Sequence, residues 1–222
     1  TESDYFERYD SKFEVLKDTL HGYFEENPEK KIIIFSTFKF TLAYLEERLS
    51  RIDFDAFVIS GDLSADERWE VMEKFKNEDE VKILLSSEVG SEGIDLQFCS
   101  ALINYDLPWN PMKIEQRIGR IDRIGQKEKT IKIFNFYVKK TIDEIIHNRL
   151  WKRIAIFENV LGDIESILEK TINDLTKKIY SHTLTFEQKV ELVEQTAVAI
   201  EKNLNDEKEL EDQSGDLVAF YD

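Results

Sequence analysis

The stretch Lys31-Ile32-Ile33-Ile34-Phe35-Ser36 decides the fold class, because it is an apolar, β-branched run of strand length. Such runs are typical of strands in a parallel sheet that is covered on both faces. Further strand patterns follow, separated by segments of helical periodicity, over residues 56–60, 81–85, 101–105 and 130–137. Strands that alternate with helices in this way predict right-handed crossovers. The sequence therefore predicts a three-layer α/β domain with a parallel sheet over residues 31–140.

Helical patterns flank this core on both sides. Residues 1–30 are expected to lead into the domain as a helix, with an amphipathic pattern over residues 5–26. After residue 140 the pattern is wholly helical, which predicts a helical brace and extension over residues 141–202. Residues 203–222 are expected to form an acidic tail that is either disordered or a solvated helix end.

Three short patterns mark helix starts. Ser64-Ala65-Asp66-Glu67 and Thr141-Ile142-Asp143-Glu144 have the spacing of a capping box, in which a hydroxyl and a carboxylate bind each other's backbone N–H groups. Another helix is expected to open at Thr185-Phe186-Glu187-Gln188. The helix after Ser64 is predicted to point three side chains inward: Trp69, Met72 and Phe75.

Composition argues against several classes of protein. No apolar run approaches the roughly 20 residues of a membrane span, and the acidic Thr1-Glu2-Ser3-Asp4 differs from the basic start of a signal peptide. The one cysteine, Cys99, rules out an intramolecular disulfide and has apolar neighbours that favour a buried thiol. His21, His147 and His182 lack the spacing of a zinc site. We expect a cytoplasmic protein, nucleoid-associated if bacterial, with no membrane partner and no metal site.

The chemistry is concentrated in Gln116-Arg117-Ile118-Gly119-Arg120-Ile121-Asp122-Arg123-Ile124-Gly125-Gln126. Its three arginines are spaced by three residues, which places them on one face of a helix that starts at Asn110-Pro111 and ends at Gly125. Like charges so placed repel one another, so the cluster favours an anion, and guanidinium suits phosphate best. The alternative is an ordinary solvated, ion-paired helix.

Charge is uneven along the chain. The net charge of −16 argues against a protein that grips nucleic acid on its own. Residues 101–140, however, hold nine Lys and Arg against four Asp and Glu. The only basic segment is therefore the one that holds the arginine cluster.

Small polar residues follow the predicted strands. Ligands of open parallel sheets bind beyond the carboxyl ends of the strands, and glycines, hydroxyls and helix starts there can present N–H groups to phosphate. These segments are Ser36-Thr37, Gly61–Ser64, Ser86–Asp95 and Asp106–Asn110. Any single one could be a simple turn. Several of them beside an arginine helix favour a phosphate-rich ligand.

Four segments in order resemble the conserved motifs of the second RecA-like domain of superfamily 2 helicase-type motors. Residues 32–37 are similar to motif IV, residues 86–96 to motif V, and residues 116–126 to motif VI, while residues 106–111 resemble the segment between motifs V and VI. The similarity is greatest to Swi/Snf-type ATPases, especially bacterial and archaeal members, and covers residues 31 to about 160. It implies a RecA-like fold.

The resemblance implies roles in nucleotide hydrolysis. Arg123 matches the arginine finger and Arg120 its companion, and both would reach the γ-phosphate held by the other half of the motor. Gln116 would help to bind or sense the nucleotide. Asp95 matches the acidic residue that meets the ribose, and Gly93 permits a close backbone approach. The implied cofactors are ATP and Mg²⁺, held mainly by the first RecA-like domain.

The resemblance also implies contacts with nucleic acid. The matching positions are Ser36, Thr37, Gly61, Ser87 and Trp109. Trp109 would stack on a strand, although it is equally suited to act as a packing anchor. Arg68 matches a position linked to strand tracking, or else forms a local ion pair.

The sequence has no Gly-x-x-x-x-Gly-Lys-Ser/Thr pattern and no Asp-Glu-x-His box. We therefore expect the chain to be the C-terminal half of a longer motor and to be inactive as an ATPase alone. The expected partners are the N-terminal RecA-like domain of the same protein and double-stranded DNA. A DNA-bound protein or RNA polymerase is a further candidate partner. The leading hypothesis is an ATP-dependent double-stranded DNA translocase or remodeler. The alternatives are a RecA-like scaffold without ATPase activity and half of a strand-separating helicase.

Overall fold

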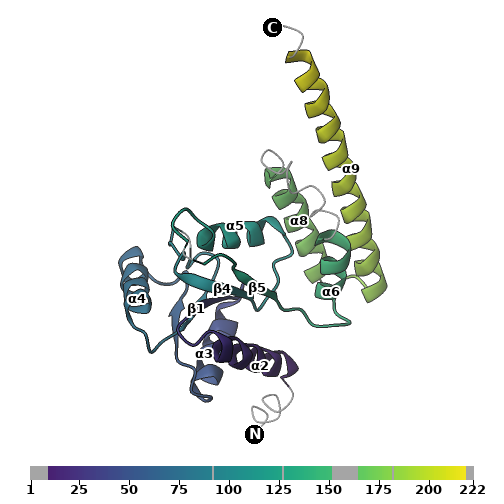
Figure 1. The fold of residues 1–222 in the computed structure, drawn as a ribbon. Coiled ribbons are helices and arrows are strands. Elements are labelled where there is room, and N and C mark those ends of the chain that lie inside the picture. The colour runs from purple at the N-terminus through teal and green to yellow at the C-terminus, as the bar shows by residue number, and fades with distance from the viewer. Residues whose placement is uncertain (1–9, 92, 127, 152–164, 182, 219–222) are drawn as a thin grey trace. The chain divides into compact units, whose positions relative to one another are not determined.

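The computed structural model describes residues 10–218 apart from residues 92, 127, 152–164 and 182 (Figure 1). The chain divides into two compact units. The first consists of Thr1–Leu107 and Gln116–Tyr137, and the second of Pro108–Glu115 and Val138–Asp222. No helix in the described part of the chain is both long and apolar enough to cross a membrane.

The first unit is built on a five-stranded sheet. The strands are β1 (Lys31–Phe35), β2 (Ala56–Ile59), β3 (Ile83–Ser86), β4 (Cys99–Asn104) and β5 (Lys132–Asn135). All neighbouring strands run parallel, in the order β2-β3-β1-β4-β5. Each of the five predicted strands is present. The central strand β1 is buried over its whole length, as expected for a strand covered on both faces.

Helices cover both faces of this sheet. Alternate residues of β1 point to opposite faces: Ile32 and Ile34 join one core cluster, and Ile33 and Phe35 join another. Helices α2 (Ser11–Glu26) and α3 (Lys39–Ser50) contribute to the first cluster, while α4 (Ala65–Asn77) and the end of α5 (Met112–Ile121) contribute to the second. The three-layer RecA-like α/β fold is therefore confirmed.

Helix α2 is part of this core. Its buried side chains, Phe13, Leu16, Leu20 and Tyr23, lie in the same cluster as the strand residues. Asp10 caps the helix by accepting from Lys12 N and Phe13 N at 3.1 and 3.0 Å. The segment predicted to lead into the domain thus completes one of its two helical layers.

Helix α4 is fixed at both ends. The predicted capping box is present: Ser64 Oγ accepts from Glu67 N at 3.3 Å, and Glu67 accepts from Ser64 N at 2.8 Å. The backbone N–H of Ser64 lowers the pKa of the Glu67 carboxyl. At the other end, the buried ammonium of Lys31 donates to the last carbonyls of the helix, with Nζ at 2.6 Å from Glu78 O. Burial lowers the pKa of Lys31.

One prediction for α4 was wrong. Met72 and Phe75 are buried, but Trp69 is 67% exposed. The three residues fit one helical stripe by spacing, but only Met72 and Phe75 enter the core cluster, whereas Trp69 lines a groove at the surface of the unit.

The second unit is helical. It contains α6 (Ile142–Ile146), a π-helical turn (His147–Trp151), α8 (Glu165–Tyr180) and α9 (Phe186–Val218). Its core is formed by aliphatic side chains of these helices: Ile146, Leu168, Ile172, Leu175, Ile179, Val193, Ala197, Ile200 and Leu204. Helix α9 continues through most of the predicted acidic tail. Of the open alternatives for residues 203–218, the structure therefore shows the helix.

The two threonine patterns behave differently. Thr185 N donates to Gln188 Oε1 at 2.8 Å and Thr185 Oγ1 accepts from Gln188 N at 3.3 Å, so this start is capped reciprocally. The capping box predicted at Thr141 is wrong. The Glu144 carboxylate accepts from Lys140 N at 2.6 Å, one residue too early, and the Thr141 hydroxyl donates to Val138 O. Lys140 adopts φ +62°, which carries its N–H to that carboxylate.

Candidate functional site

The carboxyl ends of four neighbouring strands meet at one edge of the sheet. Ser87 N donates to Ile59 O at 3.1 Å and Ser36 N to Ser86 O at 3.1 Å, while Tyr105 N donates to Phe35 O at 2.9 Å. The loops after β2, β3, β1 and β4 therefore lie side by side, as the topology of a parallel sheet requires.

Burial raises the pKa of the Tyr105 phenol, which keeps it neutral.

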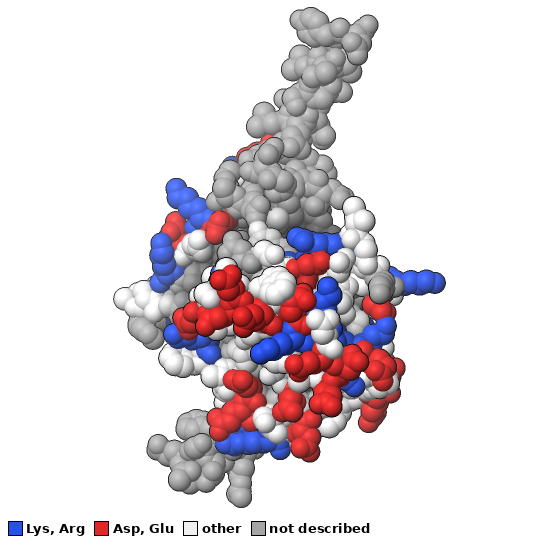
Figure 2. Space-filling model, turned by 90° about the vertical axis from the view of Figure 1, so that its left-hand side faces the viewer, with Lys and Arg blue, Asp and Glu red and all other residues white. Residues whose placement is uncertain are grey.

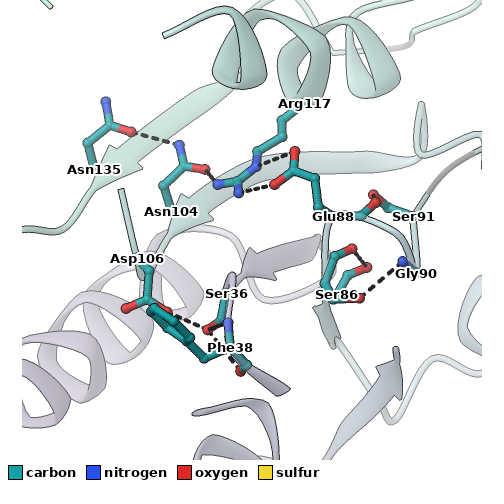
Figure 3. A network of polar contacts seen from close by, with 11 residues as sticks. Ser36, Phe38, Ser86, Glu88, Gly90, Ser91, Asn104, Asp106, Arg117 and Asn135 are labelled. Carbon is teal, nitrogen blue, oxygen red and sulfur yellow. Dashed lines mark hydrogen bonds and ion pairs between the residues drawn. The ribbon is translucent and has the colours of Figure 1, made fainter. Parts of the chain in front are cut away.

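The two residues after β1 have different surroundings. Ser36 is 0% exposed, and its hydroxyl donates to the Asp106 carboxylate and accepts from Phe38 N at 3.2 Å (Figure 3). Lys12 Nζ lies 3.2 Å from the same carboxylate. This geometry contradicts a direct contact of the Ser36 side chain with nucleic acid, because its hydroxyl is committed to holding β1 against β4. Thr37 is exposed and remains a predicted contact.

Gly61 and Ser87 lie on adjacent loops. Gly61 is exposed, and a Cβ added there would lie 3.2 Å from Val89 Cβ. Ser87 is half-buried, and its Oγ accepts from Gly90 N at 3.0 Å. The structure thus brings these two predicted nucleic-acid contacts together at one edge.

Gly90 is required by close packing. A Cβ at this position would lie 2.4 Å from Ile59 O, a backbone atom of β2 that cannot move aside. The loop after β3 therefore packs directly against the end of β2, which fixes its distance from the sheet.

Arg117 does not face an external anion. It is 0% exposed, and its guanidinium binds both carboxylate oxygens of Glu88 and donates to Asn104 Oδ1 (Figure 3). It also lies over the Phe35 ring, 4.7 Å from the centroid. The prediction that all three arginines form one phosphate-binding face was wrong, because a full charge this deep needs a carboxylate of the protein itself.

Arg120 and Arg123 have no such compensation. Arg120 Nη1 donates to Ser91 O at 2.7 Å, and Arg123 Nε donates to Gly119 O at 3.1 Å. Arg123 is exposed and Arg120 half-buried. Among the described residues, no carboxylate pairs with either guanidinium. Within the described part of the chain both arginines thus bind backbone carbonyls and are not neutralised by a carboxylate, which fits a phosphate ligand.

The arginine helix ends earlier than predicted. Helix α5 stops at Ile121, so Arg123 lies in the turn beyond it rather than on the helical face. At the other end Asn110 Oδ1 accepts from Met112 N at 3.0 Å, as expected of the cap. Gly125 adopts φ +109°, and an added Cβ would lie 2.7 Å from Gln97 Oε1, so this turn needs glycine.

The predicted nucleotide contacts lie in two places. Gly93, with φ +77°, and Asp95 line a groove of about 870 Å³ beside α4. Asp95 accepts from Gln97 N at 3.1 Å and from Gln97 Nε2 at 2.8 Å. Gln116 is exposed. Among the described residues that line the groove, Gln116, Arg120 and Arg123 do not occur.

Trp109 belongs to the helical unit. Its Nε1 donates to Asp143 Oδ1 at 3.0 Å, and its ring stacks on Tyr180 at a centroid distance of 5.3 Å and an interplanar angle of 7°. It also packs against the core of that unit. The packing alternative is therefore observed, and a contact with nucleic acid stays a prediction.

Sequence reasoning missed the partners of Arg117. Asn104 Nδ2 donates onward to Asn135 Oδ1 at 2.7 Å, so one polar chain links α5, β4 and β5. The available signal was Asn104 itself, an amide at the end of the apolar run Ala101-Leu102-Ile103. A buried amide requires partners.

Two kinds of ligand are relevant to this edge. Among the described residues there is no group of three or more His, Cys, Asp or Glu side chains that could hold a metal ion. Arg120 and Arg123, which pair with no described carboxylate, fit the phosphate groups of a nucleotide, which they would hold by charge-assisted hydrogen bonds.

Burial raises the pKa of the Cys99 thiol, which leaves it an inert core residue.

The chain resembles known proteins over this region. A relative described as "Uncharacterized ATP-dependent helicase YqhH", from Bacillus subtilis (strain 168), is 37% identical over 164 residues, which cover 72% of this chain and 29% of that protein. The chain therefore spans less than a third of the length of that relative. The crystal structure of the C-terminal part of the Fun30 ATPase domain matches with a TM-score of 0.59 and 29% identity, covering 63% of this chain and 45% of that one. Residues 11–125, from the start of α2 to Gly125, match the family described as "Helicase conserved C-terminal domain". Because that match covers more than half of the chain and includes strands β1 to β4 and the three arginines, the chain belongs to the helicase conserved C-terminal domain family.

Proposed function

We propose that the chain is the C-terminal motor half of an ATP-dependent double-stranded DNA translocase or remodeler of the Swi/Snf type. The observation that carries the proposal is the pair Arg120 and Arg123, two cationic side chains that, among the residues the structure describes, bind backbone carbonyls and no carboxylate. A scaffold without hydrolytic activity has no use for two guanidinium groups that pair with no carboxylate of the described residues at the ligand-binding edge of a parallel sheet.

The two arginines would act on a nucleotide held by the other motor half. Phosphoryl transfer spreads negative charge over the oxygens of the transferred group, and an arginine finger stabilises that charge by about 10³–10⁵ in rate. Arg123 is exposed and lies in a turn, so it can reach outward. Arg120 would reach the nucleotide after its hydrogen bond to the backbone carbonyl of Ser91 is broken. ATP and Mg²⁺ would be held chiefly by a first RecA-like domain, since this chain has no Walker-type loop.

The edge beside the arginines would form part of the nucleic-acid track. Thr37, Gly61 and Ser87 follow three neighbouring strands, and exposed backbone and hydroxyl groups there suit phosphate oxygens. Such contacts read the backbone rather than the bases. A motor with this kind of track can move along duplex DNA without sequence preference.

The test uses the full-length protein and its ATPase rate. Arg123→Ala is expected to lower the DNA-stimulated rate by about 10³, and Arg120→Ala by a comparable factor, with no loss of thermal stability. Arg51→Ala is a matched control, since Arg51 is an exposed arginine of the same unit that pairs with Glu47 at the surface, 2.5 Å away. An Arg123→Ala protein that hydrolyses ATP within a few-fold of the wild type would refute the finger assignment.

Two further measurements separate the activities. The 222-residue chain alone is expected to show no ATP turnover, and mixing it with an isolated first domain should restore some. Triplex displacement without strand separation would support translocation on duplex DNA. Efficient strand displacement would instead identify half of an unwinding helicase.

A further inference from the structure

Three arginines from two helices bind one short loop. The loop comprises residues 87–91, directly after β3. The contacts are Arg117 with the carboxylate of Glu88, Arg68 Nη1 with Val89 O at 3.1 Å, and Arg120 Nη1 with Ser91 O at 2.7 Å. Helix α4 provides the second of these guanidinium groups, and α5 the other two.

Arg117 differs from the other two in its burial and in its partner. Its side chain is 0% exposed, while that of Glu88 is 29% exposed. Taking an ion pair out of water is costly, and an apolar pair of the same shape often gives equal or greater stability. What the ion pair adds is a defined position, because the planar guanidinium binds Glu88 and Asn104 at fixed angles (Figure 3).

The opposite side of the loop is also fixed. Ser87 N donates to Ile59 O at 3.1 Å, and Gly90 packs so closely on the same carbonyl that a Cβ could not fit. The loop therefore lies between β2 on one side and α5 on the other. Because the loop is tightly packed on both sides, a displacement of one of its ends would also move the other end.

The two ends of the loop carry different parts of the proposed function. Ser87, at the start, is a predicted contact for the nucleic-acid backbone. Ser91, at the end, holds Arg120, which is predicted to contact the nucleotide. Glu88 and its ion pair with Arg117 lie between them.

We propose that Arg117 is a positioning residue that couples the two sites. Through Glu88 it fixes the loop to α5, so that nucleic acid bound at Ser87 alters the position of Arg120. This inference rests on the proposed function. It predicts that loss of the ion pair weakens the stimulation of hydrolysis by DNA more than hydrolysis itself.

The experiment measures two ATPase rates of the full-length protein, one without and one with saturating duplex DNA. Glu88→Gln removes the charge of the partner while keeping its size, and Arg117→Lys keeps the charge but loses the planar fork. Each variant is expected to lower the ratio of stimulated to basal rate about tenfold, while the basal rate changes less than about twofold. Partial unfolding cannot produce this result, because it lowers both rates in the same proportion.

Arg48→Lys is the matched control. Arg48 is also largely buried, stacks on the Phe13 ring at 4.2 Å and donates to Tyr44 Oη at 2.7 Å, but it does not contact residues 87–91. It is expected to lower the melting temperature without changing the ratio.

The outcomes separate this inference from the proposed function. If both rates of Glu88→Gln fall together with the melting temperature, the ion pair is structural only and the inference is overturned. If the wild-type rate does not respond to DNA at all, the proposed function itself is wrong and the inference falls with it. Should Arg117→Lys fail to fold, Glu88→Gln decides alone, since its side chain is partly solvated.

Discussion

At the scale of single residues, glycines show where the fold needs bare backbone and where it does not. Gly90 has no room for a Cβ, because Ile59 O lies 2.4 Å from the added atom. Gly119, in the middle of α5, has no atom within 4 Å of an added Cβ. The same substitution to alanine is therefore expected to have opposite effects on stability at the two positions.

We expect Gly90→Ala to lower the free energy of unfolding by about 1–3 kcal/mol, because the backbone of β2 or of the loop has to shift. Gly119→Ala should raise it by about 0.5–1 kcal/mol through better helix propensity. Urea titrations of the two variants beside the wild type measure both effects. Two shifts of the same sign would contradict the packing described for the loop.

At the scale of elements, one aromatic side chain, Trp109, ties its segment to the helices of the second unit. Trp109 precedes α5 in the sequence, yet its ring and its indole N–H are both occupied by residues of the helical unit. A Trp that stacks and donates in this way stabilises the contact between its segment and the helices.

Trp109→Ala is therefore expected to lower the free energy of unfolding by about 3 kcal/mol. Trp109→Phe, which retains stacking but loses the hydrogen bond to Asp143, should cost only about 1 kcal/mol. Trp69→Ala is the control, since Trp69 is 67% exposed and its loss should change stability by less than about 0.5 kcal/mol. Reduced DNA affinity of Trp109→Phe at unchanged stability would instead support the stacking role predicted from the resemblance.

At the scale of the whole molecule, charge governs the affinity for DNA. The net charge is −16, and Figure 2 shows acidic side chains interspersed with basic ones over one face. Nucleic-acid binding depends on phosphate neutralisation by cations. The predicted track residues that follow β1, β2 and β3, namely Thr37, Gly61 and Ser87, are small and uncharged.

The chain alone is thus expected to bind duplex DNA with a Kd weaker than about 10 µM at roughly 0.15 M salt. Fluorescence anisotropy of a labelled duplex measures this, and the affinity of the full-length protein gives the reference. Nanomolar binding by the isolated chain would show that its basic residues form a track of their own.

The sequence predicted the fold well because its signals are local. The apolar strands, the capping box at Ser64 and the alternation of elements follow from periodicity alone. The site was predicted only in outline. Spacing placed Arg117 with Arg120 and Arg123, but whether an arginine points outward or inward depends on Glu88, in the loop after β3, and on Asn104, at the end of β4. Side-chain partners distant in sequence cannot be read from a helical period.

The double fixation of α4 has a mechanical consequence. Its first turn is held by the Ser64 cap and bears Arg68, which grips the loop after β3, while its last carbonyls are held by Lys31 of β1. Both ends of the helix are therefore fixed by side-chain hydrogen bonds. A force on the loop would be transmitted through α4 to the central strand of the sheet, and fraying of the helix ends would not relieve it.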